Sequence, residues 1–135
     1  MKRRVMLALL GMAVLAVSAS ASTPRDMRVT NVSDNAFTVS WTTAAAETCS
    51  VVYGTVPGAL SSTEHDVRGS GTSDDTHYVV ISRLSPSTTY YFKPVSGGTT
   101  YDDGGNPYSA ATGPVLGAPS PGQTVYGLVY KPDGS

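Results

Sequence analysis

Apolar and polar residues alternate in several short segments of this chain, which is the pattern of half-buried β-strands. Residues 36–43 show it most regularly, because Phe37, Val39 and Trp41 fall on one face and threonine and serine fall between them. Comparable segments occupy 25–32, 47–54, 59–64, 76–84, 84–94 and 108–112. Outside the extreme N-terminus, no window holds a sustained apolar stripe at helical spacing. The pattern predicts an all-β domain of seven short strands.

The predicted core consists of the inward-facing residues of these strands. They are Phe37, Val39, Trp41, Val51, Tyr53, Val79, Ile81, Leu84, Tyr90 and Phe92. Cys49 shares the face of Val51 and is interpreted as a small buried hydrophobe. His77 begins its strand on the inward side, and we expect a hydrogen-bonded histidine at the rim of the core. Tyr78 and Tyr91 face outward, either as contacts for a partner or as side chains covered by cross-strand neighbours or by the linker, and these interpretations stay open.

The segment Leu84-Ser-Pro-Ser-Thr-Thr-Tyr-Tyr-Phe-Lys-Pro94 predicts a corner that leads into a strand. Pro86 marks the bend because it has no N–H to donate, and Tyr90 can bury its ring and return its hydroxyl to the backbone of the corner. The pattern Leu84-x-Pro86-x-Thr88-x-Tyr90-x-Phe92 resembles the corner of fibronectin type III domains, and Trp41 matches the tryptophan of that family's second strand. Tyr53-Gly54-Thr55 and Tyr101-Asp102-Asp103 resemble bacterial versions found in secreted multidomain proteins.

The resemblance covers residues 24–113 and implies an immunoglobulin-like β-sandwich of seven strands. One residue departs from the family pattern. Pro94 occupies an inward position where the family usually has valine, and proline cannot donate a hydrogen bond to a neighbouring strand. We therefore predict a bulge or an early end of the strand near Pro94.

The N-terminus has the organisation of a signal peptide. Lys2, Arg3 and Arg4 precede an apolar stretch over residues 5–17, and the small residues Ala19-Ser20-Ala21 follow. The apolar stretch is shorter than the roughly 20 residues that span a bilayer. We expect a signal peptide over 1–21 that is cleaved between Ala21 and Ser22, and a mature protein that is secreted, extracellular or at the cell surface, with no membrane association.

The C-terminal part has a different composition. Residues 114–123 are rich in proline and glycine and are predicted to be a linker. Residues 124–135 alternate again and end in the turn signal Lys131-Pro132-Asp133-Gly134. This segment resembles the opening hairpin of carboxypeptidase regulatory-like or prealbumin-like β domains. Since two strands alone do not form a stable domain, we expect the start of a second β module and a chain that is a fragment of a multidomain protein.

Charge and chemistry exclude several function classes. Removal of three basic residues with the signal peptide leaves six Lys and Arg against ten Asp and Glu, a net charge of −4, which argues against nucleic acid as a partner. Cys49 is the only cysteine, so it forms no disulfide within the chain. Two histidines and one cysteine on different strands argue against a metal centre, and no motif predicts a cofactor or a catalytic site.

Two acidic segments are candidates for weak calcium sites, since calcium prefers clustered oxygen ligands on flexible loops. They are Asp102-Asp103-Gly104-Gly105-Asn106 and Asp74-Asp75. A turn kept soluble by its acids is the preferred interpretation of both.

The resemblance implies a non-catalytic module that acts as an extracellular spacer, adhesion or protein-interaction domain. Its expected partners are an extracellular protein or polysaccharide and the neighbouring domains of the same chain. The alternative is an accessory domain of a longer secreted hydrolase, either a glycosidase or a metallophosphatase. A carbohydrate-binding module that uses exposed tyrosines is the third hypothesis.

Overall fold

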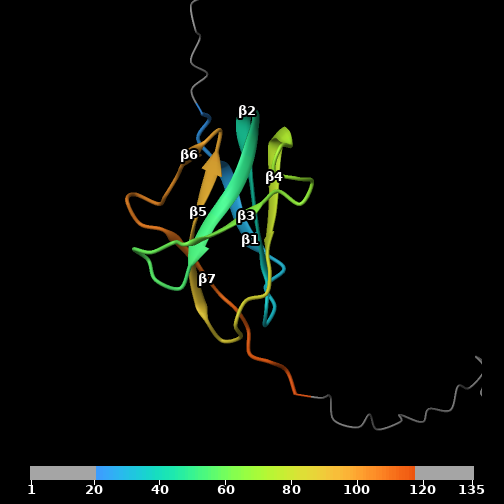
Figure 1. Cartoon of the computed structure of the whole chain (residues 1–135), viewed down its shortest axis with the longest axis vertical. Coiled ribbons are helices and arrows are strands. Elements are labelled where there is room, and N and C mark those ends of the chain that lie inside the picture. Colours follow the sequence, from blue (N-terminus) through green and yellow to red (C-terminus); the bar gives the residue numbers. More distant parts are fainter. Residues whose placement is uncertain (1–20, 118–135) are drawn as a thin grey trace, which may run out of the picture.

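A computed structural model describes residues 21–117, and every regular element in this range is a β-strand (Figure 1). The strands are β1 (Arg25–Thr30), β2 (Phe37–Gly54), β3 (Ser62–His65), β4 (Ser73–Ile81), β5 (Thr89–Ser96), β6 (Thr99–Thr100) and β7 (Tyr108–Ala111). All pairings between these strands are antiparallel. Residues 21–117 thus form the all-β domain that the alternation predicted.

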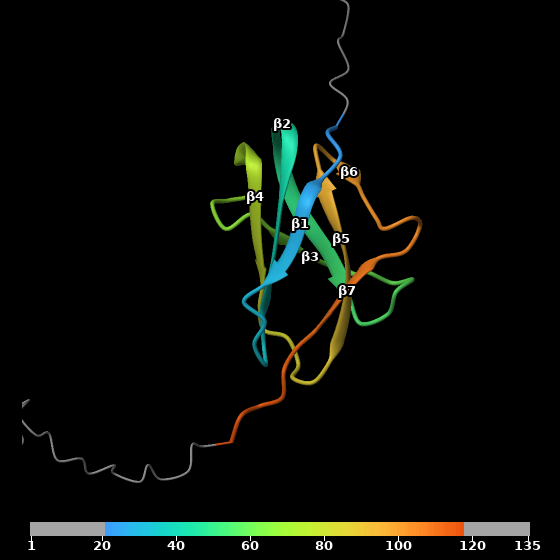
Figure 2. The ribbon, with the colours of Figure 1, turned by 180° about the vertical axis from the view of Figure 1, so that it is seen from behind.

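The strands form two layers that share β2. The first half of β2 pairs with β1 on one side and β4 on the other. Its second half pairs with β3 and β5, and β5 also pairs with β6 and β7. Figures 1 and 2 show that the described chain enters at one end of this sandwich and leaves at the other.

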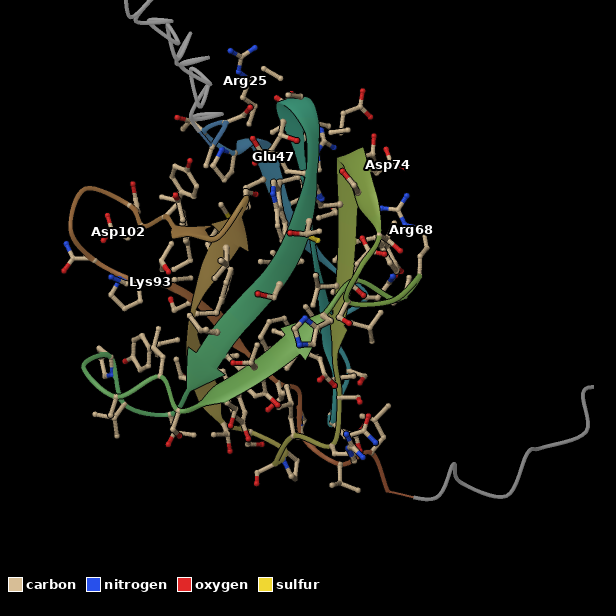
Figure 3. All side chains as sticks on the ribbon, turned by 45° about the horizontal axis from the view of Figure 1, so that its top comes forward. Arg25, Glu47, Arg68, Asp74, Lys93 and Asp102 are labelled. Atoms are coloured by element: carbon tan, nitrogen blue, oxygen red, sulfur yellow. The ribbon has the colours of Figure 1, made fainter. Side chains whose placement is uncertain are left out.

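The alternation predicted separate strands over 36–43 and 47–54, whereas β2 is one continuous strand that includes Ala44, Ala45 and Ala46. The strand runs unbroken through these alanines and bends there, and Figure 3 shows Glu47 at this bend. Thr42 pairs with Thr76 whereas Glu47 pairs with Asp74, so β2 carries extra residues in the bend. The alanines have no turn chemistry that would end a strand, and extra residues in one strand bend it strongly.

The core lies between the two layers. Its buried apolar residues are Phe37, Val39, Trp41, Cys49, Val51, Val79, Ile81, Leu84, Tyr90 and Phe92. Tyr53, assigned to the core from its alternation, is only partly buried and packs against this cluster from the side. The indole Nε1 of Trp41 in β2 donates a hydrogen bond to the hydroxyl of Ser96, the last residue of β5, at 2.9 Å. The only tryptophan of the chain is therefore both buried and hydrogen-bonded.

The corner before β5 forms as predicted. The backbone N–H of Ser85 donates to the Tyr90 hydroxyl at 2.9 Å, while the Tyr90 side chain is 8% exposed. Thr112 closes the other side of the corner, because its hydroxyl donates to the Ser85 carbonyl at 2.7 Å. The tyrosine corner that the spacing of Leu84, Pro86 and Tyr90 indicated is thereby confirmed.

The predicted bulge or early strand end at Pro94 is wrong. β5 continues to Ser96, and its register with β2 is regular from Gly54 opposite Tyr91 to Cys49 opposite Ser96. The Pro94 carbonyl accepts from the Tyr101 N–H at 2.9 Å, so the backbone polar groups of Pro94 point away from β2. On that side the partner strand is interrupted between β6 and β7. Pro94 therefore leaves no acceptor unpaired, because its missing N–H faces the gap between β6 and β7.

Other strand boundaries moved by a few residues. β3 lies at 62–65 rather than 59–64, and β4 lies at 73–81 rather than 76–84. β4 starts early because Ser73 and Asp74 pair with the residues just after the bend of β2. The number of strands in the described range still equals the expected seven, because β2 merges two predicted strands and β6 adds a short one.

Three expectations lie outside the described residues. They are the body of the signal peptide, most of the 114–123 linker, and the second β module at 124–135. Within residues 21–117, no helix has the length and apolar character that a membrane crossing requires.

Candidate functional site

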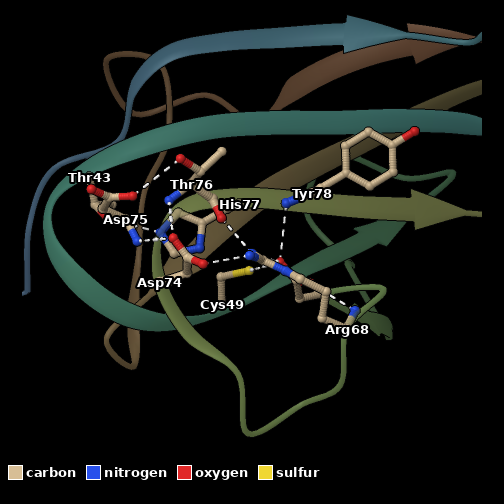
Figure 4. A network of polar contacts seen from close by, with 9 residues as sticks. Thr43, Cys49, Arg68, Asp74, Asp75, Thr76, His77 and Tyr78 are labelled. Atoms are coloured by element: carbon tan, nitrogen blue, oxygen red, sulfur yellow. Dashed lines mark hydrogen bonds and ion pairs between the residues drawn. The ribbon is translucent and has the colours of Figure 1, made fainter.

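Three polar side chains from different segments of the chain meet inside the sandwich. They are Cys49 of β2, Asp66 of the loop after β3, and His77 of β4, and one potential ligand atom of each lies within 4.8 Å of the others. Their exposed fractions are 4%, 3% and 1%, respectively. Figure 4 shows Cys49 and His77 among the hydrogen bonds that join this loop to β4. We call these three residues the buried polar cluster.

Asp66 is held by Arg68 through both carboxylate oxygens. Arg68 donates Nε to Oδ1 at 2.8 Å and Nη2 to Oδ2 at 2.8 Å, in a bidentate pair. The backbone N–H of Arg68 adds a third bond at 2.9 Å, and that of Tyr78 adds a fourth at 3.2 Å. The Arg68 hydrogen bonds hold the pKa of Asp66 below its usual range, although burial opposes this. Asp66 is therefore a carboxylate at neutral pH.

His77 lies deep in the core, which corrects the expectation of a rim histidine. Its ring packs on Trp41 with the ring centroids 5.1 Å apart, and its Nε2 lies 2.9 Å from the Thr43 hydroxyl. That hydroxyl donates its hydrogen to the Ala45 carbonyl, so His77 must donate from Nε2 and keep a bare lone pair on Nδ1. Nδ1 has no hydrogen-bond partner among the described residues. Burial lowers the pKa of His77, which keeps the ring neutral.

Cys49 is unsuited to nucleophilic chemistry. Its thiol donates to Asp66 Oδ2 with the sulfur 3.6 Å from the oxygen. Burial, assisted by the negative charge of Asp66, raises the pKa of Cys49 to about 12. Since the thiolate is the reactive form of cysteine, the protonated thiol serves here as a weak hydrogen-bond donor.

The buried polar cluster also fits a metal ion poorly. The Asp66 oxygens are already occupied by Arg68, whose positive charge would repel a cation beside it. The geometry instead joins the loop that follows β3 to β2 and β4. The sequence holds one local indication of this cluster, the acid-base pair Asp66-x-Arg68. The pair alone does not predict the cluster, because Cys49 and His77 are recognised as its partners only from their inward-facing positions on two other segments.

The two outward tyrosines do not form one surface. Tyr78 lies on β4 of the first sheet, is 38% exposed, and accepts a hydrogen bond from Asn31 Nδ2 at 3.2 Å. Tyr91 lies on β5 of the second sheet, is half-buried, and stands between Gly54 of β2 and Ser109 of β7. Each therefore has the surroundings of a cross-strand neighbour.

The acidic segments are engaged in local interactions. Asp102 accepts from Lys93 Nζ at 2.9 Å and from the Gly105 N–H at 2.9 Å, and the Lys93 hydrogen bond lowers its pKa (Figure 3). Asp103 forms a backbone bridge with Asn106. Asp74 accepts from the Asp75 backbone and from Arg68, while Asp75 accepts from the Thr76 hydroxyl. These contacts are those of structured turns.

An exposed apolar groove of about 470 Å³ lies where the described chain leaves the sandwich. Its lining residues are Val32, Ser33, Asp34, Gly113, Pro114, Val115 and Leu116. Gly113 is anchored to the domain by its N–H on the Ser33 carbonyl at 2.8 Å, whereas Val115 and Leu116 are 66% and 85% exposed. We call this surface the exit groove. Pro114, Val115 and Leu116 fall in the segment that the composition predicted to be a linker.

Comparison with known proteins places the domain in a family. The family model "Purple acid Phosphatase, N-terminal domain" matches residues 24–112. "Probable purple acid phosphatase 20" of Arabidopsis thaliana is 33% identical over 81 residues, a match that covers 52% of this chain and 18% of that protein. The chain thus spans less than a fifth of the length of this relative.

Among solved structures, the fn3 domain of human contactin 1 matches with a TM-score of 0.54 at 19% identity, covering 83% of this chain and 96% of that one. This likeness shows the fold, a fibronectin type III β-sandwich. The family match extends over about the same residues as the seven strands, from just before β1 to just after β7. The chain therefore belongs to the family of purple acid phosphatase N-terminal domains.

Proposed function

We propose that this chain is the N-terminal accessory domain of a longer exported phosphatase and that the domain itself is non-catalytic. The observation that carries the proposal is the family match over residues 24–112, together with a relative of which this chain covers only 18%. The description of this family is that of the N-terminal domain of a phosphatase. The hydrolase alternative from the sequence is therefore favoured over the free-standing spacer or adhesion module.

The exit groove supports a neighbour on this side of the domain. Exposed apolar surface that is rimmed by polar residues marks an interaction site. Val32, Val115 and Leu116 expose 50%, 66% and 85% of their surface at the point where the chain leaves the sandwich. Because Gly113 is anchored to Ser33, whatever follows Leu116 begins beside this groove. We infer that the next domain of the phosphatase covers it.

The chemistry of the described residues supports a non-catalytic role. Cys49 is protonated, His77 is neutral and buried, and Asp66 is occupied by Arg68. None of these three groups is therefore free to act on a substrate. Phosphate ester hydrolysis would belong to the part of the protein that follows.

Immunoprecipitation of the native protein tests the proposal. An antibody raised against the chain from Ser22 to Ser135 is expected to recover one polypeptide several times longer than this chain that hydrolyses a chromogenic phosphomonoester. The recombinant chain from Ser22 to Ser135 is the control and is expected to release no phosphate. A native polypeptide without phosphatase activity would contradict the proposal and restore the spacer or adhesion hypothesis.

The exit groove is tested in the same native protein. Leu116→Asp is expected to loosen the packing of the two domains and so to speed proteolytic cleavage between them. Val67→Asp is the matched control, because Val67 is 57% exposed but lies in the loop after β3 and does not line the groove. Equal cleavage rates for the two variants would exclude the groove as the interface.

A further inference from the structure

Glu47 receives the first backbone nitrogen of the expected mature chain. The backbone N–H of Ser22 donates to Glu47 Oε1 at 2.5 Å, across 25 residues of sequence. Glu47 lies at the bend of β2, and Figure 3 shows this bend at the end of the molecule where the described chain begins. The contact therefore joins the bend of the longest strand to the residue that follows the predicted cleavage site.

The second oxygen of the same carboxylate is left without a partner. Glu47 Oε2 is buried and has no hydrogen-bond donor among the described residues. A buried carboxylate oxygen that lost its hydration and gained no donor is unfavourable. The Ser22 amide cannot supply a second bond, since a peptide nitrogen carries a single hydrogen. The Glu47 carboxylate can therefore accept more hydrogen bonds than the Ser22 amide of the uncleaved chain donates.

The surroundings of Oε2 indicate where additional hydrogens would come from. A side chain at Gly97 would begin 3.0 Å from Oε2 and 3.1 Å from the Ala21 Cβ, so Ala21, Glu47 and Gly97 meet at one point. Gly97 also has a φ of +55°, a conformation that favours glycine. Ala21 is the residue that cleavage would remove. Its departure would free space beside Oε2 at the position next to the Ser22 nitrogen.

We propose that Glu47 is a binding site for the α-ammonium group that signal peptide cleavage creates at Ser22. Hydrolysis of the Ala21–Ser22 bond consumes one water: the hydroxyl goes to the Ala21 carbonyl carbon, and the hydrogen goes to the Ser22 nitrogen. This amine then takes up a proton from solvent and becomes an ammonium with three hydrogens. It keeps its bond to Oε1 and donates a second one to Oε2, in a charge-assisted pair.

The consequence is that maturation itself completes the fold at this end of the sandwich. The uncleaved chain holds Glu47 by one neutral donor, and the mature chain holds it by a cation. The inference depends on the cleavage site and is independent of the phosphatase proposal, because neither the exit groove nor a second domain takes part.

The first test locates the mature N-terminus. The full chain is produced in a secreting bacterium, and the first residue of the exported protein is determined by mass spectrometry. Ser22 is the expected first residue. Any other first residue would overturn the proposal.

The second test displaces the amine by one residue. Chains that start at Ser22 and at Ala21 are each made by proteolytic removal of a tag, with Ser135 as the last residue. The Ser22 chain is expected to have a Tm about 5 °C higher than the Ala21 chain. This is the Tm shift that one additional charge-assisted hydrogen bond causes in a domain of this length. Glu47→Gln should abolish this difference, whereas Glu64→Gln, at the only other glutamate, should leave it.

Equal Tm values for the two starts, or a difference that persists in Glu47→Gln, would contradict the proposal. A chemical probe applies even where Glu47→Gln does not fold. Periodate oxidises an N-terminal serine through its adjacent amino and hydroxyl groups. The Ser22 chain is expected to react several-fold more slowly than a peptide of residues 22–27, and equal rates would overturn the proposal.

Discussion

Arg68 binds Asp66 two residues away through both carboxylate oxygens, and this pair connects the surface loop after β3 to the centre of the sandwich. The side chain of Asp66 is 1% exposed whereas that of Arg68 is 40% exposed. The arginine therefore covers a buried anion and keeps one side in solvent. The same carboxylate also accepts from the Tyr78 N–H and the Cys49 thiol, so one residue serves the loop, β4 and β2.

Asp66→Ala is expected to lower the free energy of unfolding by about 3 kcal/mol, because it leaves the Tyr78 N–H and the guanidinium without their acceptor. Urea denaturation followed by circular dichroism measures the change. Asp74→Ala is the control, since Asp74 contacts the same arginine at its exposed end. That variant should be nearly neutral, and equal losses in both variants would contradict the importance of the buried pair.

The stability of the domain should fall on acidification below about pH 6.5, the ordinary pKa of histidine. Burial lowers the pKa of His77 in the folded state, so the unfolded chain binds the proton more readily and acid favours unfolding. The loss begins at the unfolded pKa and continues down to the folded one. Asp66, whose pKa is also lowered, adds a further loss at lower pH in the same direction.

His77→Gln should remove the part of this pH dependence that begins near pH 6.5, as measured by urea denaturation at several pH values. Glutamine stays neutral and can still donate to Thr43. His65→Gln is the matched control, because His65 is the other histidine and is exposed. A pH dependence that disappears in His65→Gln but persists in His77→Gln would refute the assignment.

Tyr90→Phe should destabilise the domain by about 2 kcal/mol, since it leaves the Ser85 N–H without an acceptor in the corner. Tyr91→Phe removes the same atom from the adjacent residue, whose side chain faces outward, and should change stability little. Thermal unfolding of the two variants measures the contrast. A Tyr91 variant as unstable as the Tyr90 variant would show that the corner hydrogen bond is not the cause.

Ser96→Ala should cost about 1–2 kcal/mol, because the buried Trp41 indole N–H loses its acceptor. The chain has a single tryptophan, so its fluorescence reports directly on this position during denaturation. Ser109→Ala on the exposed side of β7 is the control and should leave both the emission and the midpoint unchanged. Unaltered emission and stability in Ser96→Ala would rule out this bond.

Cys49 should be unreactive in the folded domain. With a pKa of about 12, the thiol is protonated at pH 8, and it is also 4% exposed. A disulfide reagent at pH 8 is expected to modify the native chain far more slowly than the chain in urea. Rapid modification of the native chain would show that the cysteine is accessible and ionised.

Within a strand, the alternation of the sequence decides which residues are buried, because neighbouring side chains must point to opposite faces. For this reason the alternation alone places Phe37, Val39 and Trp41 in the interior, where the structure has them. The tyrosine corner was equally accessible, since Tyr90 and Ser85 are only five residues apart. Local spacing thus determined the all-β class, the corner and most of the core, whereas the sandwich architecture was implied by the resemblance to fibronectin type III domains.

Pairing between distant strands decided the rest. β2 bends because its two halves pair with different strands, the first with β4 and the second with β5. Pro94 fits into β5 without a bulge because its missing N–H faces the gap between β6 and β7. Cys49, Asp66 and His77 meet because the register of β2 with β4 and the path of the loop after β3 bring two strands and one loop to one point. No spacing along the chain encodes such distances, so the buried polar cluster and the contact between Ser22 and Glu47 became visible only in three dimensions.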